Sequence, residues 1–403
     1  MLNKPLAGVR VIEVSMWAFV PSAGAVLADW GAEVVKIEAP TGDPIRGLTF
    51  GGVGAAEGLA WTFELFNRGK RAMSLDLTIP QAQDVLHELV KDADVFLCSL
   101  LPAAREKLRI DAATIREINP SIVYAAGSGT GPKGPDAGKG GYDSISFWSR
   151  GSVSASVTPA DMAPLGMPSG AFGDSLSGMS LAGGIVAALL HKERTGEGSV
   201  VDVALLGTAM WSMQMAIVGA AVAGLEEMPK AQPGMVANPL VNNYQTSDGR
   251  YIALCMLQPD AYWDPFTRHI GRADLAEDPR FSTGPERAQH GAEAVSELAK
   301  TFAEKTLDEW KPILRGQRGQ WDVVNKVGDL LRDEQAIENG FVQRVKYDNG
   351  GELPLISSPV LFDGQAPELV PAPGFAADTD AVLQELGWDE ERILESKISG
   401  AVI

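Results

Sequence analysis

The stretch that decides the fold is VRVIEVSMWAFVPSAGAVLADWGAEVVKIEAP, residues 9–40. It opens on a short β-branched run over 9–14, which is typical of a buried strand. The small residues from Ser22 onward then predict a helix that ends at Gly31. A second β-branched run follows and stops at Pro40. A strand, a helix and a strand in so short a segment favour a parallel sheet.

The same alternation continues down the chain to residue 129. Further apolar runs predict strands, and the segments between them predict helices with proline at one end. The predicted strands are 72–77, 94–100 and 121–129, and the predicted helices are 80–93 and 111–120. Strands that alternate with helices of this length form a parallel sheet covered on both faces. We therefore expect an α/β fold, with a Rossmann-like parallel sheet in a large domain.

The middle of the chain has a different character. No charged residue lies between Asp202 and Glu226, and this stretch predicts one long helix. Because Gly207, Ser212 and Gln214 dilute its apolarity, we expect other protein to bury it and do not expect a membrane span. A hairpin signal and short charged helices follow, as in a small α+β domain. The expected parts are a large α/β domain over 1–205, a long linking helix over 206–225, a small α+β domain over 226–325, and a return to the large domain over 326–403.

The bulk composition limits the partners and the compartment. Acidic residues outnumber basic ones by 52 to 34, which gives a formal net charge of −18. Such a surface repels polyanions, so we expect neither nucleic acid nor an anionic membrane as a partner. Cys98 and Cys255 lack a CxxC partner and predict free thiols of a reducing compartment, the cytoplasm. The four histidines are scattered, so we expect no metal site.

Two common catalytic motifs fail on inspection. Gly127, Gly129 and Gly131 follow a predicted strand, but Pro132 and a long coil replace the helix that a dinucleotide fingerprint must open. We therefore expect no nicotinamide cofactor. The serine-hydrolase elbow GxSxG also fails, because GDSLSG carries a serine where the second glycine must stand.

Asp174 is the one carboxylate in AFGDSLSGMSLAGGIVAALL, a long apolar stretch that predicts a helix. As a structural residue it would cap this helix by accepting from the following amides. As a nucleophile it would profit from Gly173 and Gly178, which let a substrate or another backbone approach closely. A carboxylate at a helix N-terminus is stabilised as an anion, so it would stay charged at neutral pH. The cap and the nucleophile are compatible interpretations.

A basic cluster leads into the predicted strand 72–77. In an acidic protein such a cluster is either a solvated face or a local phosphate site, and the residues alone leave both open. Its members are Arg68, Lys70 and Arg71, with Lys36, Lys107, Lys133 and Lys139 at other predicted loop ends.

Taken together, these segments resemble the class III CoA-transferases, the CaiB/BaiF family that includes formyl-CoA transferase and the carnitine and bile-acid CoA-transferases. The likeness covers almost the whole chain, and the ordered set is far more specific than any one motif. The segments are PLAGVRVIEVSMWAFVPSAGAVLADWGAEVVKIEAPTGDPIR, FNRGKRAMSLDL, INPSIVYAAGSG, GGYDSISFWSRGS, GDSLSGM, KERTGEGSVVDVALL and NPLVNNYQTSDGRYIAL.

The resemblance implies that Asp174 is the nucleophile of an acyl-CoA:carboxylate CoA-transferase. It would move CoA from an acyl-CoA to a small free carboxylic acid through aspartyl anhydride and aspartyl-CoA thioester intermediates. Coenzyme A is then a substrate, and neither ATP nor a metal is needed. Tyr142 and Gly173 are expected to contact the substrate, and GMVANP, residues 234–239, is the counterpart of a glycine-rich loop that covers the site in relatives.

The resemblance also carries over a CoA site and shows where this chain departs from it. Ala18 stands where formyl-CoA transferase has a glutamine, Lys107 matches an arginine near the phosphates, and Ala39 replaces an adenine-side arginine. Oxalate and formate are therefore poor candidates for the substrates. The implied CoA-binding residues are Trp17, Ala18, Leu75, Thr78, Ser99, Leu100, Lys107, Lys139, Gly140, Tyr142 and Asp143.

Relatives form interlocked dimers, so the resemblance implies a homodimer in which the uncharged helix is covered by the partner. Two alternatives stay open from the residues. An α-methylacyl-CoA racemase needs two opposed acid and base groups, and Tyr142 stands where racemases have a histidine. A non-catalytic acyl-CoA-binding protein would need the basic loops but no carboxylate framed by glycines.

Overall fold

The computed structural model describes residues 4–56, 58–230 and 238–403. The chain divides into two compact units, a large one formed by Met1–Met228 with Leu331–Ile403 and a small one formed by Pro229–Leu330. We expected boundaries near residues 205, 225 and 325. The division that the structure gives keeps the whole uncharged stretch in the large unit.

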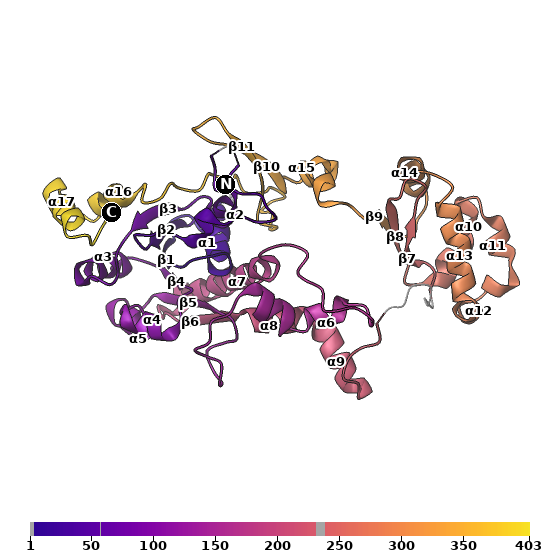
Figure 1. Ribbon diagram of the computed structural model, residues 1–403, viewed down its shortest axis with the longest axis horizontal. Helices are drawn as coiled ribbons and strands as arrows, with labels where there is room; N and C mark the ends of the chain where they lie inside the picture. The colour runs from indigo at the N-terminus through magenta and orange to yellow at the C-terminus, as the bar shows by residue number, and fades with distance from the viewer. Residues whose placement is uncertain (1–3, 57, 231–237) are drawn as a thin grey trace. The chain divides into compact units, whose positions relative to one another are not determined.

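The large unit is built on a parallel sheet of six strands among the described residues, in the order β3-β2-β1-β4-β5-β6 (Figure 1). Every strand pair in it is parallel. The expected α/β fold with a Rossmann-like parallel sheet is therefore confirmed, and the order reverses between β1 and β4. The strands are β1 (Arg10–Val14), β2 (Glu33–Glu38), β3 (Arg71–Ser74), β4 (Val95–Cys98), β5 (Val123–Ser128) and β6 (Val200–Ala204).

The strands read as continuous apolar runs because both faces of the sheet are buried. In β4, Val95 and Leu97 face a core that contains α1 (Phe19–Asp29) and α7 (Phe172–Thr195). Phe96 and Cys98 face a second core that contains α3 (Pro80–Lys91) and α5 (Ala112–Ile118). Each strand therefore contributes side chains to two hydrophobic clusters.

The helices that cover this sheet include the two expected around 80–93 and 111–120. Together with α1 they follow the predicted alternation of strand and helix. The helices of the large unit are α1 (Phe19–Asp29), α2 (Trp61–Asn67), α3 (Pro80–Lys91), α4 (Pro102–Lys107), α5 (Ala112–Ile118), α6 (Val153–Val157), α7 (Phe172–Thr195), α8 (Leu205–Ser212), α9 (Gln214–Ala223), α15 (Glu334–Glu338), α16 (Thr379–Glu385) and α17 (Glu390–Ile398), with the 3-10 helix η1 (Pro44–Gly47) and the π-helix η2 (Asp143–Ser149).

The C-terminal part of the chain returns to the large unit and covers the sheet edge at β3. The Ala72 N–H donates to the Asp378 carboxylate at 2.8 Å, and the Ser74 N–H donates to Thr379 Oγ1 at 3.2 Å. An edge strand whose N–H groups are occupied cannot pair with another chain. The same segment carries a hairpin of β10 (Val342–Lys346) and β11 (Glu352–Ile356).

The small unit is an antiparallel sheet of order β7-β8-β9 packed on helices. Tyr244, Ile252 and Leu254 point from the sheet into a core with Trp263, Phe302 and Trp310. The hairpin turn expected at Ser-Asp-Gly-Arg joins β7 to β8. Its elements are β7 (Val241–Gln245), β8 (Tyr251–Cys255), β9 (Trp321–Val323), α10 (Pro259–His269), α11 (Ala273–Glu277), η3 (Pro279–Phe281), α12 (Gly284–Gln289), α13 (Gly291–Phe302) and α14 (Leu307–Arg315), and η4 (Val327–Arg332) leads back to the large unit.

The single linking helix expected over 206–225 is two helices in the structure. α8 and α9 meet at Met213 with a bend of 65°. Among the described residues, α7 and this bent pair are long and apolar enough to cross a membrane by length and composition alone. In the structure one face of α7 packs against α1 and the sheet through Leu181 and Ile185.

Candidate active site

The first cavity of interest lies where the sheet order reverses, outside the carboxyl ends of β1 and β4. It has a volume of about 340 Å³. Met16 and Trp17 from the turn after β1, Ser99 from the end of β4, and Tyr142 line it together with Asp174. Open parallel sheets bind their ligands at this position, because the loops on either side diverge there.

Asp174 lies in the first turn of α7, but it does not cap the helix. The residue at the N-cap is Ala171, in the left-handed region with φ of 58°. The acceptor for the free amides comes from η2, where one oxygen of Asp143 accepts the Gly173 N–H at 2.8 Å and the Asp174 N–H at 3.4 Å. The interpretation of Asp174 as a helix cap is therefore wrong, and its carboxylate is free to face the cavity.

Two glycines hold Asp174 in place by permitting close packing. A Cβ on Gly173 would lie 2.3 Å from the Phe147 ring and 2.5 Å from Asp143 Oδ1. A Cβ on Gly178 would lie 1.7 Å from Ser22 Oγ in α1. We expected these glycines to admit a substrate or another backbone, and the atoms that approach both of them in the structure belong to the protein, among them the Phe19 carbonyl oxygen at Gly178.

The electrostatics of the cavity oppose the ionised form of Asp174. Desolvation, and next to it the nearby Asp143 carboxylate, raise the pKa of Asp174 to about 7. Desolvation also raises the pKa of Asp143, against the two amides that it accepts from. The expectation that the helix N-terminus keeps Asp174 fully charged at neutral pH is therefore wrong. A carboxylate of raised pKa is the more basic and the more nucleophilic one when it is ionised.

A second cavity of about 290 Å³ adjoins the first. Met16 and Leu100 line both cavities. Leu75 and Thr78, from the segment after β3, line the second one, as the sequence predicted for a CoA site. The two cavities together extend from Asp174 across the ends of β1 and β2 toward β3.

The remaining predicted site residues line neither cavity, in the part of the chain that the structure describes. Ala18 is buried behind the first turn, Gly173 is buried at the start of α7, and Asp143 is buried at the start of η2. Lys107, Lys139 and Gly140 are exposed. Of the expected covering loop, residues 234–237 lie outside the described residues.

Sequence reasoning missed two charged residues that line the first cavity. Arg105, in α4, directs its guanidinium Nε to the Leu100 carbonyl oxygen, and Asp202 stands on the edge strand β6. The signal for Arg105 was its place one turn into a helix that Pro102 opens at the end of β4. Asp202 is separated in sequence from β5 by the long helix α7. The spacing of residues therefore could not show that Asp202 lies beside the end of β5.

The basic cluster is not a phosphate site. Arg68 pairs with Asp29 at 2.7 Å, and Arg71 pairs with Glu385 at 2.8 Å. Lys70 is fully buried and pairs with Glu13 at 2.8 Å. Because Arg68 and Lys70 are paired inside the protein and Arg71 is paired with Glu385 at the surface, the phosphate interpretation of Arg68, Lys70 and Arg71 is wrong. Burial of a cation requires such a partner.

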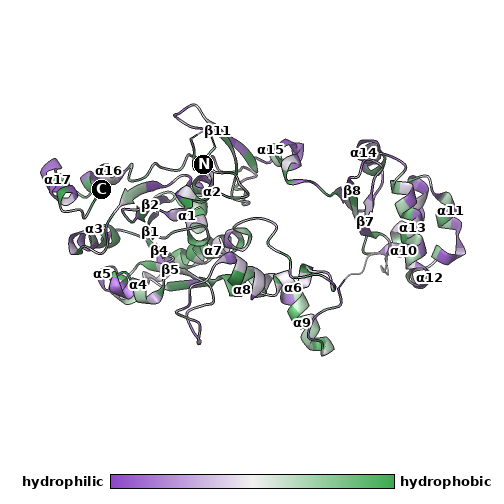
Figure 2. Ribbon diagram, in the orientation of Figure 1, coloured by the Kyte–Doolittle hydropathy of each residue, from purple (hydrophilic) through white to green (hydrophobic). Residues whose placement is uncertain are grey.

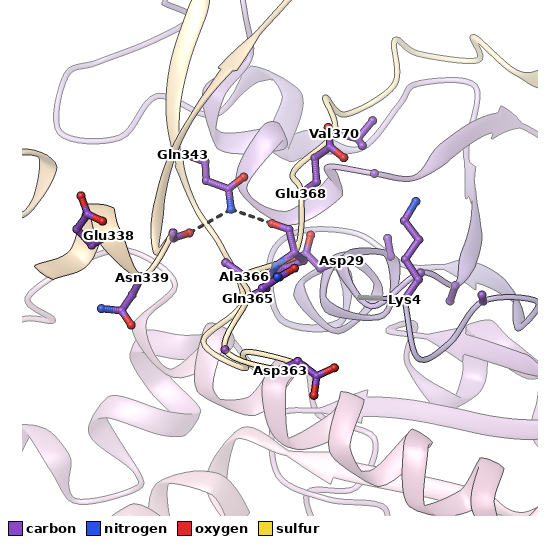
Figure 3. Close-up of a pocket in the computed structure, with 18 residues that line it drawn as sticks. Lys4, Asp29, Glu338, Asn339, Gln343, Asp363, Gln365, Ala366, Glu368 and Val370 are labelled. Atoms are coloured by element: carbon purple, nitrogen blue, oxygen red, sulfur yellow. Dashed lines mark hydrogen bonds between the residues drawn. The ribbon is translucent and has the colours of Figure 1, made fainter. Parts of the chain in front are cut away.

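A cavity of about 1180 Å³ lies elsewhere in the large unit (Figure 3). It opens at the amino end of β2 beside Gly31, opposite to the edge where parallel sheets bind ligands. Acidic side chains such as Glu338 and Asp363 line it, and Gln343 donates to the carbonyls of Gly340 and Pro367. Its size alone does not make it the candidate site, because it lies at the edge opposite to the one where parallel sheets bind their ligands.

Known proteins resemble this chain over nearly its full length. The chain is 35% identical over 400 residues to the (R)-2-hydroxy-4-methylpentanoate CoA-transferase of Clostridioides difficile, which covers 98% of this chain and 99% of that protein. It is 34% identical over 393 residues to the cinnamoyl-CoA:phenyllactate CoA-transferase of Clostridium sporogenes, which covers 96% and 95% of the two chains.

A solved structure agrees with these relatives. A CaiB/BaiF family protein from Brucella suis matches with a TM-score of 0.81 and 25% sequence identity, over 95% of this chain and 100% of that one. The sequence model of CoA-transferase family III matches residues 6–379 of this chain. The resemblance drawn from the sequence motifs is therefore confirmed, and the chain belongs to CoA-transferase family III and is an acyl-CoA transferase.

Proposed function

We propose that this enzyme moves CoA from an acyl-CoA to a free carboxylic acid and that Asp174 is its nucleophile. The observation that carries the proposal is the position of the Asp174 carboxylate. It faces a cavity at the reversal point of the sheet, and Asp143 relieves it of the capping role. A carboxylate held in this way can form an acyl-enzyme.

The proposed reaction has four displacements at acyl carbons. The Asp174 carboxylate attacks the donor thioester carbon, the C–S bond breaks, and a mixed anhydride and CoA thiolate form. The thiolate attacks the Asp174 carbonyl, and the donor acid leaves as its carboxylate. The acceptor carboxylate then attacks the aspartyl-CoA thioester and expels the thiolate. Attack of the thiolate on the acceptor carbonyl releases the new acyl-CoA and restores Asp174.

The protein has to orient the reacting groups and exclude water during these steps, because anhydride and thioester intermediates hydrolyse in water. Trp17 contacts Tyr142 edge to face, with ring centroids 6.1 Å apart, and both rings border the cavity that holds Asp174. Phe19 and Leu205 add apolar walls. We propose that Tyr142 orients the thioester and that Gly173, packed closely against Phe147 and Asp143, holds Asp174 toward the substrate.

Coenzyme A would extend from the first cavity into the second. Its apolar chain would pass Trp17, Ser99 and Leu100 and end near Leu75 and Thr78. An acidic protein needs local cations for the CoA phosphates. We propose exposed Lys107 and Lys139 for this role. The loop at Gly140, with Ala18 and Asp143 behind it, would then shape the site from the protein side.

The acids exchanged are proposed from the relatives and from the cavity wall. Two relatives are named for 2-hydroxy-4-methylpentanoate and for cinnamoyl-CoA and phenyllactate, acids with a branched or aromatic apolar side chain. The wall of the first cavity carries Met16, Phe19, Val20 and Leu205. Such a surface favours an apolar side chain over formate or oxalate. A panel of free acids assayed against one acyl-CoA donor would rank these classes.

Neither alternative activity gains support. A racemase needs a second acid or base opposite Asp174, and the histidine that racemases have for that role is replaced by Tyr142, while one oxygen of the buried Asp143 carboxylate already accepts two backbone amides. Within the described residues, no histidine lines either cavity. A protein that only binds acyl-CoA would have no use for a carboxylate that it keeps at a pKa of about 7.

We propose a homodimer in the cytoplasm, with the bent pair α8 and α9 at the interface. This pair is apolar along its length (Figure 2). Trp211 is 72% exposed, Met215 88% and Val222 85%, as a surface awaiting a partner would be. A second copy would bury these side chains and would explain why no charge interrupts the stretch.

The experiment that tests the proposal traps the covalent intermediate on Asp174. The protein is incubated with an acyl-CoA, quenched with hydroxylamine, and digested for mass spectrometry. A hydroxamate at Asp174 is expected, and none at Asp202, the other carboxylate in the cavity. Asp174→Asn should lose at least about 1,000-fold in CoA exchange. Full activity of Asp174→Asn, or a hydroxamate at Asp202 instead, would refute the proposed nucleophile.

A further inference from the structure

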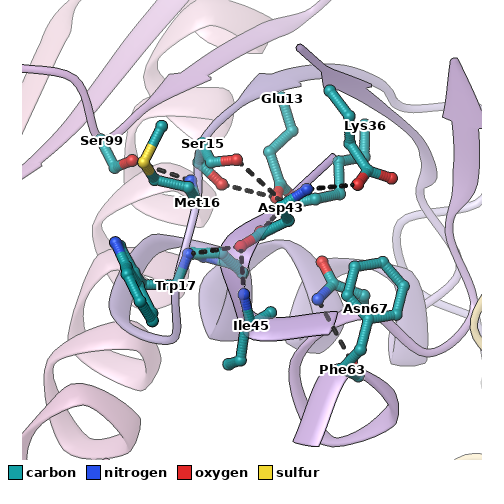
Figure 4. A network of polar contacts seen from close by, with 12 residues as sticks. Glu13, Ser15, Met16, Trp17, Lys36, Asp43, Ile45, Phe63, Asn67 and Ser99 are labelled. Carbon is teal, nitrogen blue, oxygen red and sulfur yellow. Dashed lines mark hydrogen bonds and ion pairs between the residues drawn. The ribbon is translucent and has the colours of Figure 1, made fainter. Parts of the chain in front are cut away.

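A buried network of charges lies directly behind the turn that follows β1 (Figure 4). Glu13 and Lys36 are fully buried, Asp43 is 5% exposed, and Lys70 and Asn67 complete the group. Removing two cations and two carboxylates from water is costly, and apolar residues of the same size often stabilise a core as well. Stability alone therefore does not account for the network.

Lys36 is the centre of the network and reaches three partners. Its Nζ lies 2.9 Å from Asp43 Oδ2, 3.3 Å from Glu13 Oε1 and 3.0 Å from the Ser15 carbonyl oxygen, to which it donates. Burial alone would lower the pKa of Lys36, but the carboxylates of Glu13 and Asp43 outweigh it and raise that pKa. Lys36 is therefore a permanent cation that ties the end of β1 to the loop after β2.

The backbone of Asp43 is itself held by Glu38, so its carboxylate can hold the turn that contains Trp17. Its own N–H donates to Glu38 Oε2 at 2.8 Å, and Glu38 pairs with Arg46 at 2.6 Å. The carboxylate oxygen of Asp43 that does not pair with Lys36, Oδ1, accepts the Ile45 N–H and the Trp17 N–H, each at 3.1 Å. The carboxylate thus connects Lys36 to the backbone of the turn.

The turn itself is strained. Trp17 has φ of 69°, in the left-handed region that bulky residues avoid. Such a conformation persists only when its surroundings impose it. Three bonds impose it here: Lys36 to the Ser15 carbonyl, the Met16 N–H to Ser99 Oγ at 3.0 Å, and the Trp17 N–H to Asp43. Met16 is shared by both cavities, and Trp17 borders the one that contains Asp174.

We propose that Lys36 and Asp43 are positioning residues of the CoA-transferase reaction, which hold the strained Ser15–Trp17 turn where the two cavities meet. They act through the backbone and not on the reacting atoms. The inference rests on the proposed function in one respect, that acyl-CoA passes this turn on its way to Asp174. A carboxylate suits the task, because one oxygen of Asp43 pairs with Lys36 while the other accepts the Trp17 N–H.

The test separates the hydrogen bond from the charge. Asp43→Ala removes both, whereas Asp43→Asn removes the charge and keeps a carbonyl oxygen for the Trp17 N–H. The matched control is Asp29→Ala, which also orphans a buried cation, Arg68, but does so at the far end of α1. Melting temperature and kcat/KM for the acyl-CoA are measured for all three variants.

A positioning role predicts that Asp43→Ala lowers kcat/KM by about 100-fold. Asp43→Asn should stay within about tenfold of the wild type and Asp29→Ala within about threefold. Equal losses in the two alanine variants, or in Asp43→Asn and Asp43→Ala, would overturn the proposal. If Asp43→Ala does not fold, the fluorine NMR signal of fluorotryptophan at Trp17 decides. Its chemical shift should be the same in Asp43→Asn as in the wild type, and a changed chemical shift would overturn the proposal.

Failure of the proposed function gives a different result. Asp174→Asn, assayed beside these variants, reports on the nucleophile alone. An active Asp174→Asn would end the role of Asp174, while the loss in Asp43→Ala relative to Asp29→Ala would still report whether the turn is held for catalysis.

Discussion

At the scale of single residues, the pair of carboxylates Asp143 and Asp174 decides how the site works. Asp143 accepts the amides at the start of α7 and adds negative charge beside Asp174. The two titrate as a pair, so a pH profile reports apparent values that belong to both. The pair was not foreseen, because a helix cap from a segment thirty residues upstream leaves no trace in local spacing.

Asp143→Asn should move the pH dependence of the reaction. Attack on the thioester needs the Asp174 carboxylate, so kcat/KM for the acyl-CoA should rise with pH through about 7. An asparagine oxygen still accepts the amides but removes the neighbouring charge, which lowers the pKa of Asp174. The acidic limb of the profile should therefore move to lower pH. In Asp202→Asn, the control in the same cavity, the limb should stay in place. An unmoved limb in Asp143→Asn would contradict this account.

Asp174→Asn should stabilise the fold at high pH and not at low pH. The pKa of Asp174 is about 7 in the folded state and about 4 when unfolded. Between those values the folded protein holds a proton that the unfolded chain has released, so stability falls as pH rises through this window. An asparagine at position 174 does not titrate, so the variant does not lose this stability as pH rises. We expect a gain of roughly 1–2 kcal/mol at about pH 8, discounted for solvent in the open cavity, and none at about pH 4. Urea unfolding at the two pH values measures it, and an equal effect at both would contradict the pKa.

At the scale of elements, the contact between α1 and α7 positions the nucleophile. Ser22 Oγ donates to the Phe19 carbonyl and lies 3.4 Å from the Asp174 carbonyl oxygen. The sequence predicted both helices from their apolar runs, and it predicted β1 to β5 beneath them but not the edge strand β6. It did not predict that the uncharged stretch breaks at Met213, since no proline or paired glycine marks the bend.

Two glycines of α7 provide a matched test of this contact. A Cβ on Gly178 would clash with Ser22 Oγ and approach the Phe19 carbonyl oxygen to 2.8 Å, whereas a Cβ on Gly183 meets nothing within 4 Å. Gly178→Ala should force the helices apart and cost about 1–3 kcal/mol, with a loss of CoA exchange. Gly183→Ala should be neutral or gain up to about 1 kcal/mol in helix propensity. Thermal unfolding and activity are measured for both, and similar values for the pair would contradict the packing.

The buried ion pairs show why the basic cluster misled the sequence analysis. Lys70 stands beside Arg68 and Arg71 in sequence, so all three predict a surface patch. Burial lowers the pKa of Lys70 to about 7 in spite of its contact with Glu13, a partner 57 residues away. Spacing cannot reveal a partner on another strand, and only the folded sheet brings the two together.

At the scale of the whole molecule, the apolar surface of α8 and α9 points to a second copy. The sequence predicted that this stretch would be covered, but within one chain Met215 and Val222 are almost fully exposed. Exposed apolar area of this kind marks an interface in soluble proteins. The fold class followed from periodicity, whereas the boundary of the small unit depends on contacts that no single segment encodes.

Charge placed on this surface should separate the copies. Met215→Glu with Val222→Glu puts two carboxylates where the partner is expected, so a dimer should dissociate. Ile398→Glu in α17, where the side chain is 78% exposed, is the matched control and should leave the assembly intact. Light scattering after size-exclusion chromatography gives the mass. A monomeric wild type, or a dimer that survives the double substitution, would contradict the assignment of this surface.

The most direct test of the central claim follows an oxygen atom. If the acceptor carboxylate attacks an aspartyl-CoA thioester, the bridging oxygen of the second anhydride comes from the acceptor and stays on Asp174 when the new acyl-CoA leaves. Turnover with an acceptor acid labelled with oxygen-18 should therefore place the label in the peptide that contains Asp174, as mass spectrometry detects. Label found only in the released donor acid, with Asp174 unlabelled, would show direct transfer between the substrates and contradict the account.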